Sequence, residues 1–101
     1  MQFLAQVFIT SPLEVTNAIL IQQSKNVWDY QKQGIIRAAY SISKPEDDTY
    51  DEIFILEAAS IDRAREVISS LPLISRGLAN SRVTPMNPYK PHNKGYFCPR
   101  S

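Results

Sequence analysis

The sequence has too few cysteines and histidines to build a disulfide or a zinc site of its own. One cysteine, Cys98, and one histidine, His92, lie near the carboxyl end of a chain of 101 residues. A disulfide within the chain needs two cysteines, and a structural zinc ion is usually held by four cysteine or histidine side chains. We therefore expect no internal disulfide and no metal.

The chain also lacks an excess of charge of either sign. It carries 11 Lys and Arg residues against 10 Asp and Glu residues, which gives a formal net charge of +1. Proteins that bind nucleic acid or an anionic membrane through charge usually carry a strong positive excess. The composition therefore predicts neither a nucleic-acid partner nor a membrane partner.

Long apolar runs are missing as well. Residues 1–9 are apolar but too short to cross a bilayer, and they have neither the basic start nor the small-residue cleavage site of a secretion signal. They are typical of a strand that opens a fold, and we expect a cytoplasmic protein. With 44% hydrophobic residues, a chain of this length can build the core of one domain.

Four strands are predicted from runs rich in β-branched and aromatic residues. Residues 3–9 are apolar at nearly every position, which is typical of a strand buried on both faces. Pro85 is expected to stop the last strand. The predicted strands span residues 3–9, 35–42, 52–58 and 79–84, with a hairpin connection over 43–51.

Two helices separate these strands. Ser11-Pro12 is a helix-start signal and Gly34 is a stop signal, so the first helix is expected over about 12–33. Ser60 is expected to cap the second helix, and Pro72 to end it. The apolar residues of the second helix have the spacing of a single buried stripe. They are Ala64, Val67, Ile68 and Leu71.

The order β-α-β-β-α-β predicts an α+β, ferredoxin-like fold. Two helices can cover only one face of a four-stranded sheet, yet the strands over 3–9 and 52–58 carry apolar residues at both parities. An exposed apolar sheet promotes aggregation, so the second face needs a cover. A second copy of the chain, packed sheet to sheet as a dimeric α+β barrel, would provide it.

Residues 89–101 differ in composition from the predicted domain over residues 1–88. Prolines, a glycine and the lack of any periodicity predict an extended C-terminal arm. Its basic and aromatic residues suit an arm that wraps a neighbouring subunit or closes its pocket. The alternative is a frayed terminus.

Polar side chains on otherwise apolar strands are candidates for a pocket that excludes water. The parity that groups them gives one such residue on each predicted strand. They suit a carboxylate base with cationic and amide donors, arranged around an enolate or a carboxylate ligand. The alternative is an arginine–glutamate pair that only ties strands or subunits together. The four residues are Gln6, Arg37, Glu57 and Arg82.

Three further residues are candidates for binding a substrate. Tyr40 and Trp28 would supply an aromatic wall and a phenolic donor, or they belong to the core. Gln22 lies in a polar stretch that interrupts the apolar residues of the first helix. It faces either a cavity or solvent.

The sequence resembles the muconolactone Δ-isomerase family over residues 1–88. The resemblance is carried by the Met-x-Phe-Leu start, by Gln33-Gly34, and by the blocks Ser70-Leu71-Pro72-Leu73 and Val83-Thr84-Pro85. It implies a dimeric α+β barrel that assembles into larger rings, up to decamers. It also implies a cofactor-free proton shift that moves a double bond in a small unsaturated lactone, within the β-ketoadipate route of aromatic breakdown.

The chain departs from this family in the first helix and in the second strand. The family has a histidine in the second strand where this chain has Ala38, whereas Arg37 matches a family arginine. The departures indicate an altered pocket that takes a larger or less charged ligand than muconolactone. Charged family residues along the first helix are replaced by Ala18, Ile19, Ile21, Gln22 and Gln23.

These observations predict a cofactor-free isomerase or cyclase that acts on a small unsaturated lactone or on an aromatic-derived, polycyclic substrate. Such chemistry needs a base near a carbon acid and a donor that stabilises the enolate. Glu57 is the predicted base, and Arg37 is predicted to hold or polarise an oxygen. The alternative function is a non-catalytic, oligomeric module that binds a small molecule.

Overall fold

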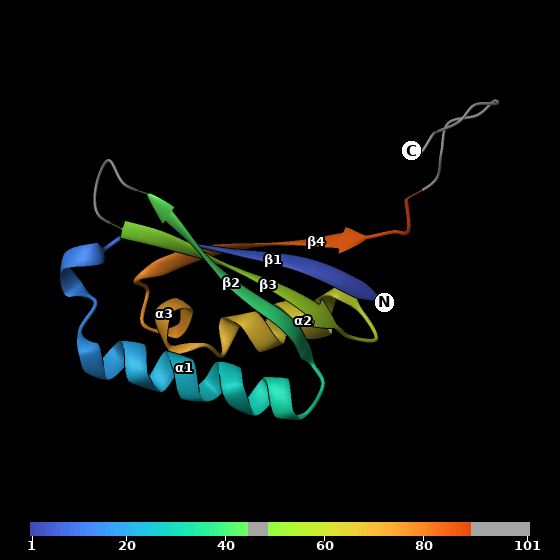
Figure 1. Ribbon diagram of the computed structural model, residues 1–101, viewed down its shortest axis with the longest axis horizontal. Coiled ribbons are helices and arrows are strands. Elements are labelled where there is room, and N and C mark those ends of the chain that lie inside the picture. Colours follow the sequence, from blue (N-terminus) through green and yellow to red (C-terminus); the bar gives the residue numbers. More distant parts are fainter. Residues whose placement is uncertain (45–48, 90–101) are drawn as a thin grey trace.

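The four strands form one antiparallel sheet in the order β2-β3-β1-β4, and the helices lie beneath it (Figure 1). The computed structural model describes residues 1–44 and 49–89. The predicted α+β, ferredoxin-like fold is confirmed. The elements are β1 (Gln2–Ile9), the 3-10 turn η1 (Pro12–Glu14), α1 (Asn17–Lys32), β2 (Ile36–Lys44), β3 (Thr49–Glu57), α2 (Ile61–Ser69), α3 (Pro72–Ser75) and β4 (Ala79–Met86).

The first helix begins later than the sequence predicted. Ser11-Pro12 starts the separate turn η1, and α1 begins only after Thr16. The Thr16 hydroxyl accepts a hydrogen bond from the Ile19 N–H at 3.3 Å, so Thr16 caps the helix. Gly34 follows the helix with a φ of 76°, a left-handed conformation that favours glycine, and the predicted stop is confirmed.

Two prolines act differently from the predictions. Pro72 follows the end of α2 as expected, but it also opens α3, because proline suits the first position of a helix. Pro85 does not stop β4, which continues to Met86. β4 is an edge strand of this sheet, where a residue without an N–H group is tolerated.

The hairpin connection is shorter than the predicted 43–51. β2 continues to Lys44 and β3 begins at Thr49, and these two residues pair with each other. Residues 45–48, and the predicted arm from residue 90 onward, lie outside the described residues.

The core lies between the sheet and the helices. Alternate residues of β1 enter it, and the predicted stripe of α2 is completely buried. The segment Leu71-Pro72-Leu73 is buried as well, so this junction between α2 and β4 is part of the core. The fully buried residues of β1, α2 and the junction include Phe3, Ala5, Val7, Ala64, Val67, Ile68, Leu71 and Leu73.

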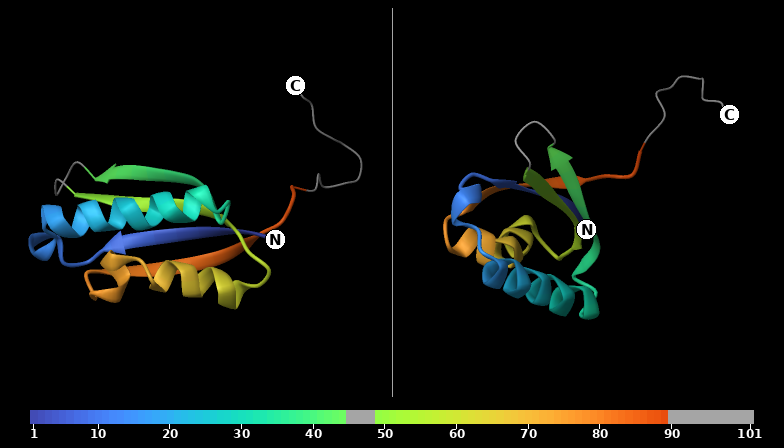
Figure 2. Two further views of the ribbon diagram at one scale, coloured as in Figure 1. Left: turned by 90° about the horizontal axis from the view of Figure 1, so that it is seen from below. Right: turned by 60° about the vertical axis from the view of Figure 1, so that its left-hand side comes forward.

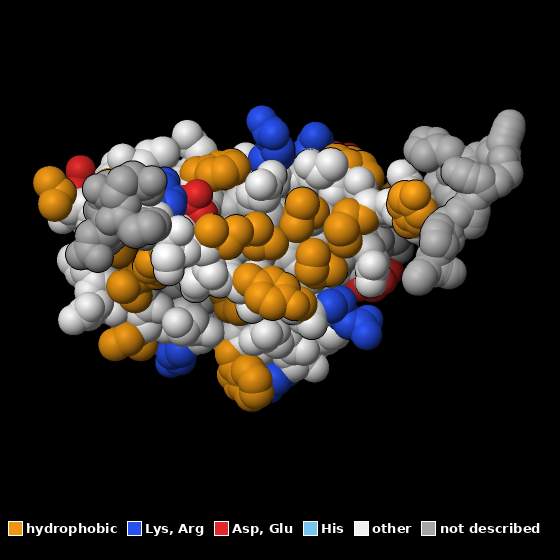
Figure 3. Space-filling model, turned by 45° about the horizontal axis from the view of Figure 1, so that its top comes forward, with side chains coloured by type: hydrophobic (Ala, Val, Ile, Leu, Met, Phe, Trp, Pro, Cys, Tyr) orange, Lys and Arg blue, Asp and Glu red, His pale blue; other side chains and the backbone are white. Residues whose placement is uncertain are grey.

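No helix within the described residues covers the opposite face of the sheet (Figure 2). Residues of β1 on this face are only partly buried within the single chain. Tyr40 and Ile42 of β2 expose 61% and 47% of their surface. Apolar side chains gather over this region (Figure 3). We call it the open face. The strand register places on it Leu4, Gln6, Phe8, Tyr40, Ile42, Asp51, Ile53, Ile55, Glu57, Arg82 and Thr84.

None of the helices in the described part of the chain combines the length and the apolar character that crossing a membrane requires.

Candidate active site

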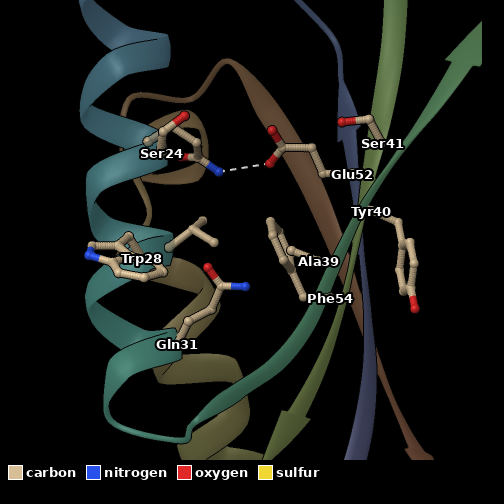
Figure 4. A pocket seen from close by; sticks show the side chains of 10 residues that line it. Ser24, Trp28, Gln31, Ala39, Tyr40, Ser41, Glu52 and Phe54 are labelled. Atoms are coloured by element: carbon tan, nitrogen blue, oxygen red, sulfur yellow. Dashed lines mark hydrogen bonds between the residues drawn. The ribbon is translucent and has the colours of Figure 1, made fainter.

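A groove of about 340 Å³ lies between α1 and the helix-side face of β2 and β3 (Figure 4). Its lining combines apolar walls with amides, hydroxyls and a single carboxyl group. α1 contributes Gln23, Ser24, Val27, Trp28 and Gln31, and the strands contribute Ala39, Tyr40, Ser41, Glu52 and Phe54.

The strand register sets the floor of the groove. Ser41 is paired with Glu52, and two residues further along Ala39 is paired with Phe54. Alternate residues of a strand face the same side of the sheet, so both pairs point toward α1. The floor therefore has a polar row beside an apolar row.

Gln23 of α1 is the buried polar residue of this region, with 2% of its surface exposed. Its Oε1 accepts a hydrogen bond from the backbone N–H of Leu73 at 3.1 Å, and its Nε2 donates to Oε1 of Glu52 at 2.9 Å. A backbone N–H can only donate, so Leu73 determines which end of the amide faces Glu52. The buried amide is thus bonded through both its oxygen and its nitrogen, as buried polar groups usually are.

The environment of Glu52 makes its carboxyl group a weaker acid than usual. Burial raises the pKa of Glu52, and the hydrogen bond from Gln23 opposes this change only in part. Burial, and secondly the negative charge of Glu52, also raise the pKa of Tyr50 on the same strand. A carboxyl whose pKa is shifted toward neutrality can both accept and return a proton, which is what general acid–base catalysis requires.

The polar residues predicted on β1 and β4 lie on the open face, on the other side of the sheet from the groove. Gln6 is paired directly with Arg82. Gln6 also opposes Ile53, which in turn opposes Tyr40, so these residues form one row across the sheet. Tyr40 contributes to the edge of the groove, but its ring points away from it (Figure 4).

Glu57 and Arg37 are not part of this row. Glu57 is paired with Gln2, four residues along β1 from Gln6, a separation of about 13 Å. One oxygen of Glu57 accepts a hydrogen bond from the N-terminal ammonium group at 2.6 Å. Arg37 is exposed and lies at an irregularity in the pairing of β2 with β3. The structure therefore does not bring Glu57 together with Gln6 and Arg82.

The two candidates on the first helix lie in different places. Trp28 lines the groove and exposes 59% of its surface, whereas Gln22 is exposed and donates a hydrogen bond to Asn26 at 2.9 Å. The amide that faces the sheet belongs to the next residue, Gln23. One residue turns the direction of a helical side chain by about 100°, so the rotation of α1 decides between the two glutamines.

Sequence reasoning missed Gln23 and Glu52 as site residues. Glu52 begins an apolar run and resembles the end of a polar turn. The sequence pattern did not single it out, because Glu52 alternates with Phe54 and Leu56 just as Glu57 alternates with Ile53 and Ile55, and only the structure shows that Phe54 and Leu56 are the buried pair. A carboxylate on the buried parity of a strand is a stronger candidate than one on the other parity.

The described residues contain no group of three or more His, Cys, Asp and Glu side chains that could hold a metal ion. The fold places the chain in the ferredoxin-like α+β class, and the groove lies between its sheet and its first helix.

No protein-family model matches the chain, and no curated protein matches its sequence. Among solved structures, it is similar to the 5-chloro-2-hydroxyhydroquinone dehydrochlorinase of Burkholderia phenoliruptrix, solved in complex with 2,5-dihydroxybenzoquinone. The similarity covers 86% of this chain and 94% of that chain, with a TM-score of 0.57 and 15% sequence identity. At this identity, the likeness shows a shared fold.

Proposed function

We propose that this protein is a cofactor-free acid–base enzyme and that the groove between α1 and the sheet is its active site. The reaction is a proton shift on a small unsaturated ring, as in an isomerase or a cyclase that acts on a lactone or an aromatic-derived substrate. The observation that carries the proposal is Glu52, a carboxyl in the groove with a raised pKa and one oxygen held by Gln23.

Two further observations support this reaction class. The blocks Ser70-Leu71-Pro72-Leu73 and Val83-Thr84-Pro85 resemble the muconolactone Δ-isomerase family. The dehydrochlorinase that shares the fold was solved with a six-membered quinone ring. Both point to small unsaturated rings as ligands, and a divergent member of the isomerase family fits them.

In the proposed mechanism, Glu52 takes a proton from a ring carbon next to a carbonyl group. The electrons of the broken C–H bond move into the ring and form a dienolate. The carboxyl of Glu52 then returns the proton to a more distant carbon, which moves the double bond and restores the carboxylate. Since Oε1 of Glu52 is bonded to Gln23, the other oxygen is the one that meets the substrate proton.

The walls of the groove suit a flat ring. Trp28 from α1 and Phe54 from β3 lie on opposite sides, and the Gln31 amide points into the space between them (Figure 4). Aromatic walls offer apolar contact to a planar ligand. The Gln31 amide would donate a hydrogen bond to the oxygen on which the enolate charge develops, the usual way of stabilising such an intermediate.

The charge of the lining favours an uncharged substrate. None of the lining residues in the described part of the chain is Lys or Arg, and Glu52 repels a second carboxylate when it is ionised. The apolar substitutions in the first helix led us to expect a ligand that is larger or less charged than muconolactone, and the lining of the groove favours the less charged one.

Two variants test the proposal by separating the two candidate carboxylates. Glu52→Gln removes the base in the groove, and Glu57→Gln removes the one predicted from the sequence. Incorporation of solvent deuterium into unsaturated lactones, followed by NMR, measures proton transfer. We expect Glu52→Gln to slow exchange by about 10²–10⁴-fold, the usual contribution of general acid–base catalysis, and Glu57→Gln to change it only slightly.

Exchange at the native rate in Glu52→Gln would contradict the proposal. Native protein that binds these lactones without exchanging any proton would instead support the alternative function, a non-catalytic binding module. Binding by the native protein and exchange are measured on the same samples, so the two outcomes are distinguished.

We also propose that a second copy of the chain covers the open face. Apolar rows cross this face, with Leu4 opposite Ile55, and Tyr40 and Ile42 exposed at one side. In a two-fold dimer each copy presents the same patch, so the apolar rows would cover one another. Light scattering tests this arrangement, and a chain that remains monomeric at micromolar concentration would contradict it.

A further inference from the structure

We propose that Gln23 is the positioning residue of this site: the N–H of Leu73 holds its amide, and the amide orients the Glu52 carboxyl toward the substrate. The inference rests on the proposed function, because it concerns the same carboxyl group. It gives the Leu71-Pro72-Leu73 junction a role in the chemistry as well as in the core.

Leu73 carries an unpaired backbone donor because it lies at the start of α3. The first N–H groups of a helix have no acceptor within the helix. Pro72 occupies the first position and has no N–H, so Leu73 presents the first of these unpaired donors. Leu73 is fully buried, out of reach of water, and the Oε1 of Gln23 is the acceptor that satisfies it at 3.1 Å.

The Leu73 N–H also determines the direction of the Gln23 amide. Turning the Gln23 amide around would place its NH₂ group against the Leu73 N–H and its oxygen against Glu52. Two donors would then face each other, as would two acceptors, and both hydrogen bonds would be lost. A single orientation of Gln23 is therefore favoured, and its N–H points at Glu52.

The hydrogen bond from Gln23 in turn affects the ionisation of Glu52. The Gln23 donor favours the ionised carboxylate and so opposes the effect of burial on its pKa. Glu52 is paired with Val7 of β1 and Ser41 of β2. The titratable neighbour on the same face of β3 is Tyr50, whereas Asp51 faces the other side of the sheet, where its carboxylate forms an ion pair with Lys44 at 3.4 Å. Tyr50 titrates at a far higher pH than a carboxyl group, so it keeps one charge state while Glu52 titrates. A change in the titration midpoint of Glu52 when Gln23 is replaced therefore reports the loss of the Gln23 hydrogen bond.

The native protein provides the first test, by NMR titration with the Glu52 carboxyl carbon, the Gln23 side-chain amide and the Leu73 backbone amide as probes. We expect the three signals to titrate with a common midpoint. In Glu52→Gln, the pH dependence of the two amides should disappear. A Leu73 amide that does not follow the Glu52 titration would overturn the inference.

A pair of adjacent variants provides the second test. Gln23→Met keeps the length of the side chain without its donor and acceptor, and Gln22→Met makes the same change at the exposed neighbour. We expect Gln23→Met to shift the Glu52 midpoint to higher pH, and to shift the acid limb of the exchange-rate profile with it. Gln22→Met should shift neither.

An unmoved Glu52 midpoint in folded Gln23→Met would overturn the positioning role, whether or not the protein transfers protons. If Gln23→Met does not fold, the titration of the native protein decides alone. The proposed function fails separately, through exchange at the native rate in Glu52→Gln.

Discussion

Replacing Gln23 with methionine should destabilise the fold, because it removes the hydrogen bonds of Gln23 to Leu73 and to Glu52. The Leu73 N–H loses its acceptor in a fully buried position, which costs about 1–3 kcal/mol. Glu52 loses a donor at 2.9 Å, but it borders the groove, where water replaces part of the bond, so we add about 1 kcal/mol. The expected loss of unfolding free energy is thus about 2–4 kcal/mol.

Urea denaturation followed by circular dichroism measures this change. Thermal melting gives a second measurement, since in a domain of this size each kcal/mol lowers the melting temperature by about 4–8 °C, so a fall of about 8–32 °C is expected. Gln22→Met is the matched control, because Gln22 is exposed, and it should stay within about 0.5 kcal/mol of the native protein. All samples are compared at one protein concentration, because a dimer is stabilised by mass action. Equal stability of the two variants would refute the reasoning.

Three further outcomes are expected. Because the pKa of Glu52 is raised in the folded state, its contribution to stability is present below the ordinary carboxyl pKa of 4.5 and is lost as pH rises through the folded value. Glu52→Gln should therefore melt above the native protein at neutral pH, and thermal scans from pH 4 to 8 that run parallel for the two proteins would contradict this. Ile55→Lys, which places a charge on the open face, should give a monomer by light scattering while the Glu52 titration stays unchanged; an unchanged mass would argue against a dimer through this face. The methyl ester of an unsaturated lactone acid should bind more tightly than the free acid in calorimetry, and Glu52→Gln should reduce the difference; equal affinity of acid and ester would contradict an uncharged substrate.

The fold was largely predictable because its signals are local. The Ser60 cap, the apolar stripe of α2 and the glycine at position 34 each act within a few residues. The errors lie where two local signals compete. Ser11-Pro12 and Thr16 both resemble helix starts. In the structure, Ser11-Pro12 begins only the short turn η1, and Thr16 caps α1.

The residues of the candidate groove could not be chosen from the sequence alone, because β3 carries a carboxylate on each of its faces. Glu52 and Glu57 are five residues apart and so lie on opposite sides of the sheet. Neither carboxylate differs from the other in local sequence pattern. The packing of α1 against one face decides which of them borders a groove, and the rotation of α1 decides that Gln23, rather than Gln22, faces it.

By itself, the sequence determined the order of the elements, the sheet with two apolar faces, and the buried stripe of α2 that ends at Leu71. These follow from periodicity and from the backbone preferences of proline and glycine, which act over short distances. Only the tertiary structure decided the candidate site. Its central contact joins Gln23 to Leu73, fifty residues apart in the chain. The buried Leu73 N–H sets the direction of that amide and, with it, the orientation of Glu52. This N–H has no acceptor within α3, and Gln23 comes within reach of it only when α3 packs against α1.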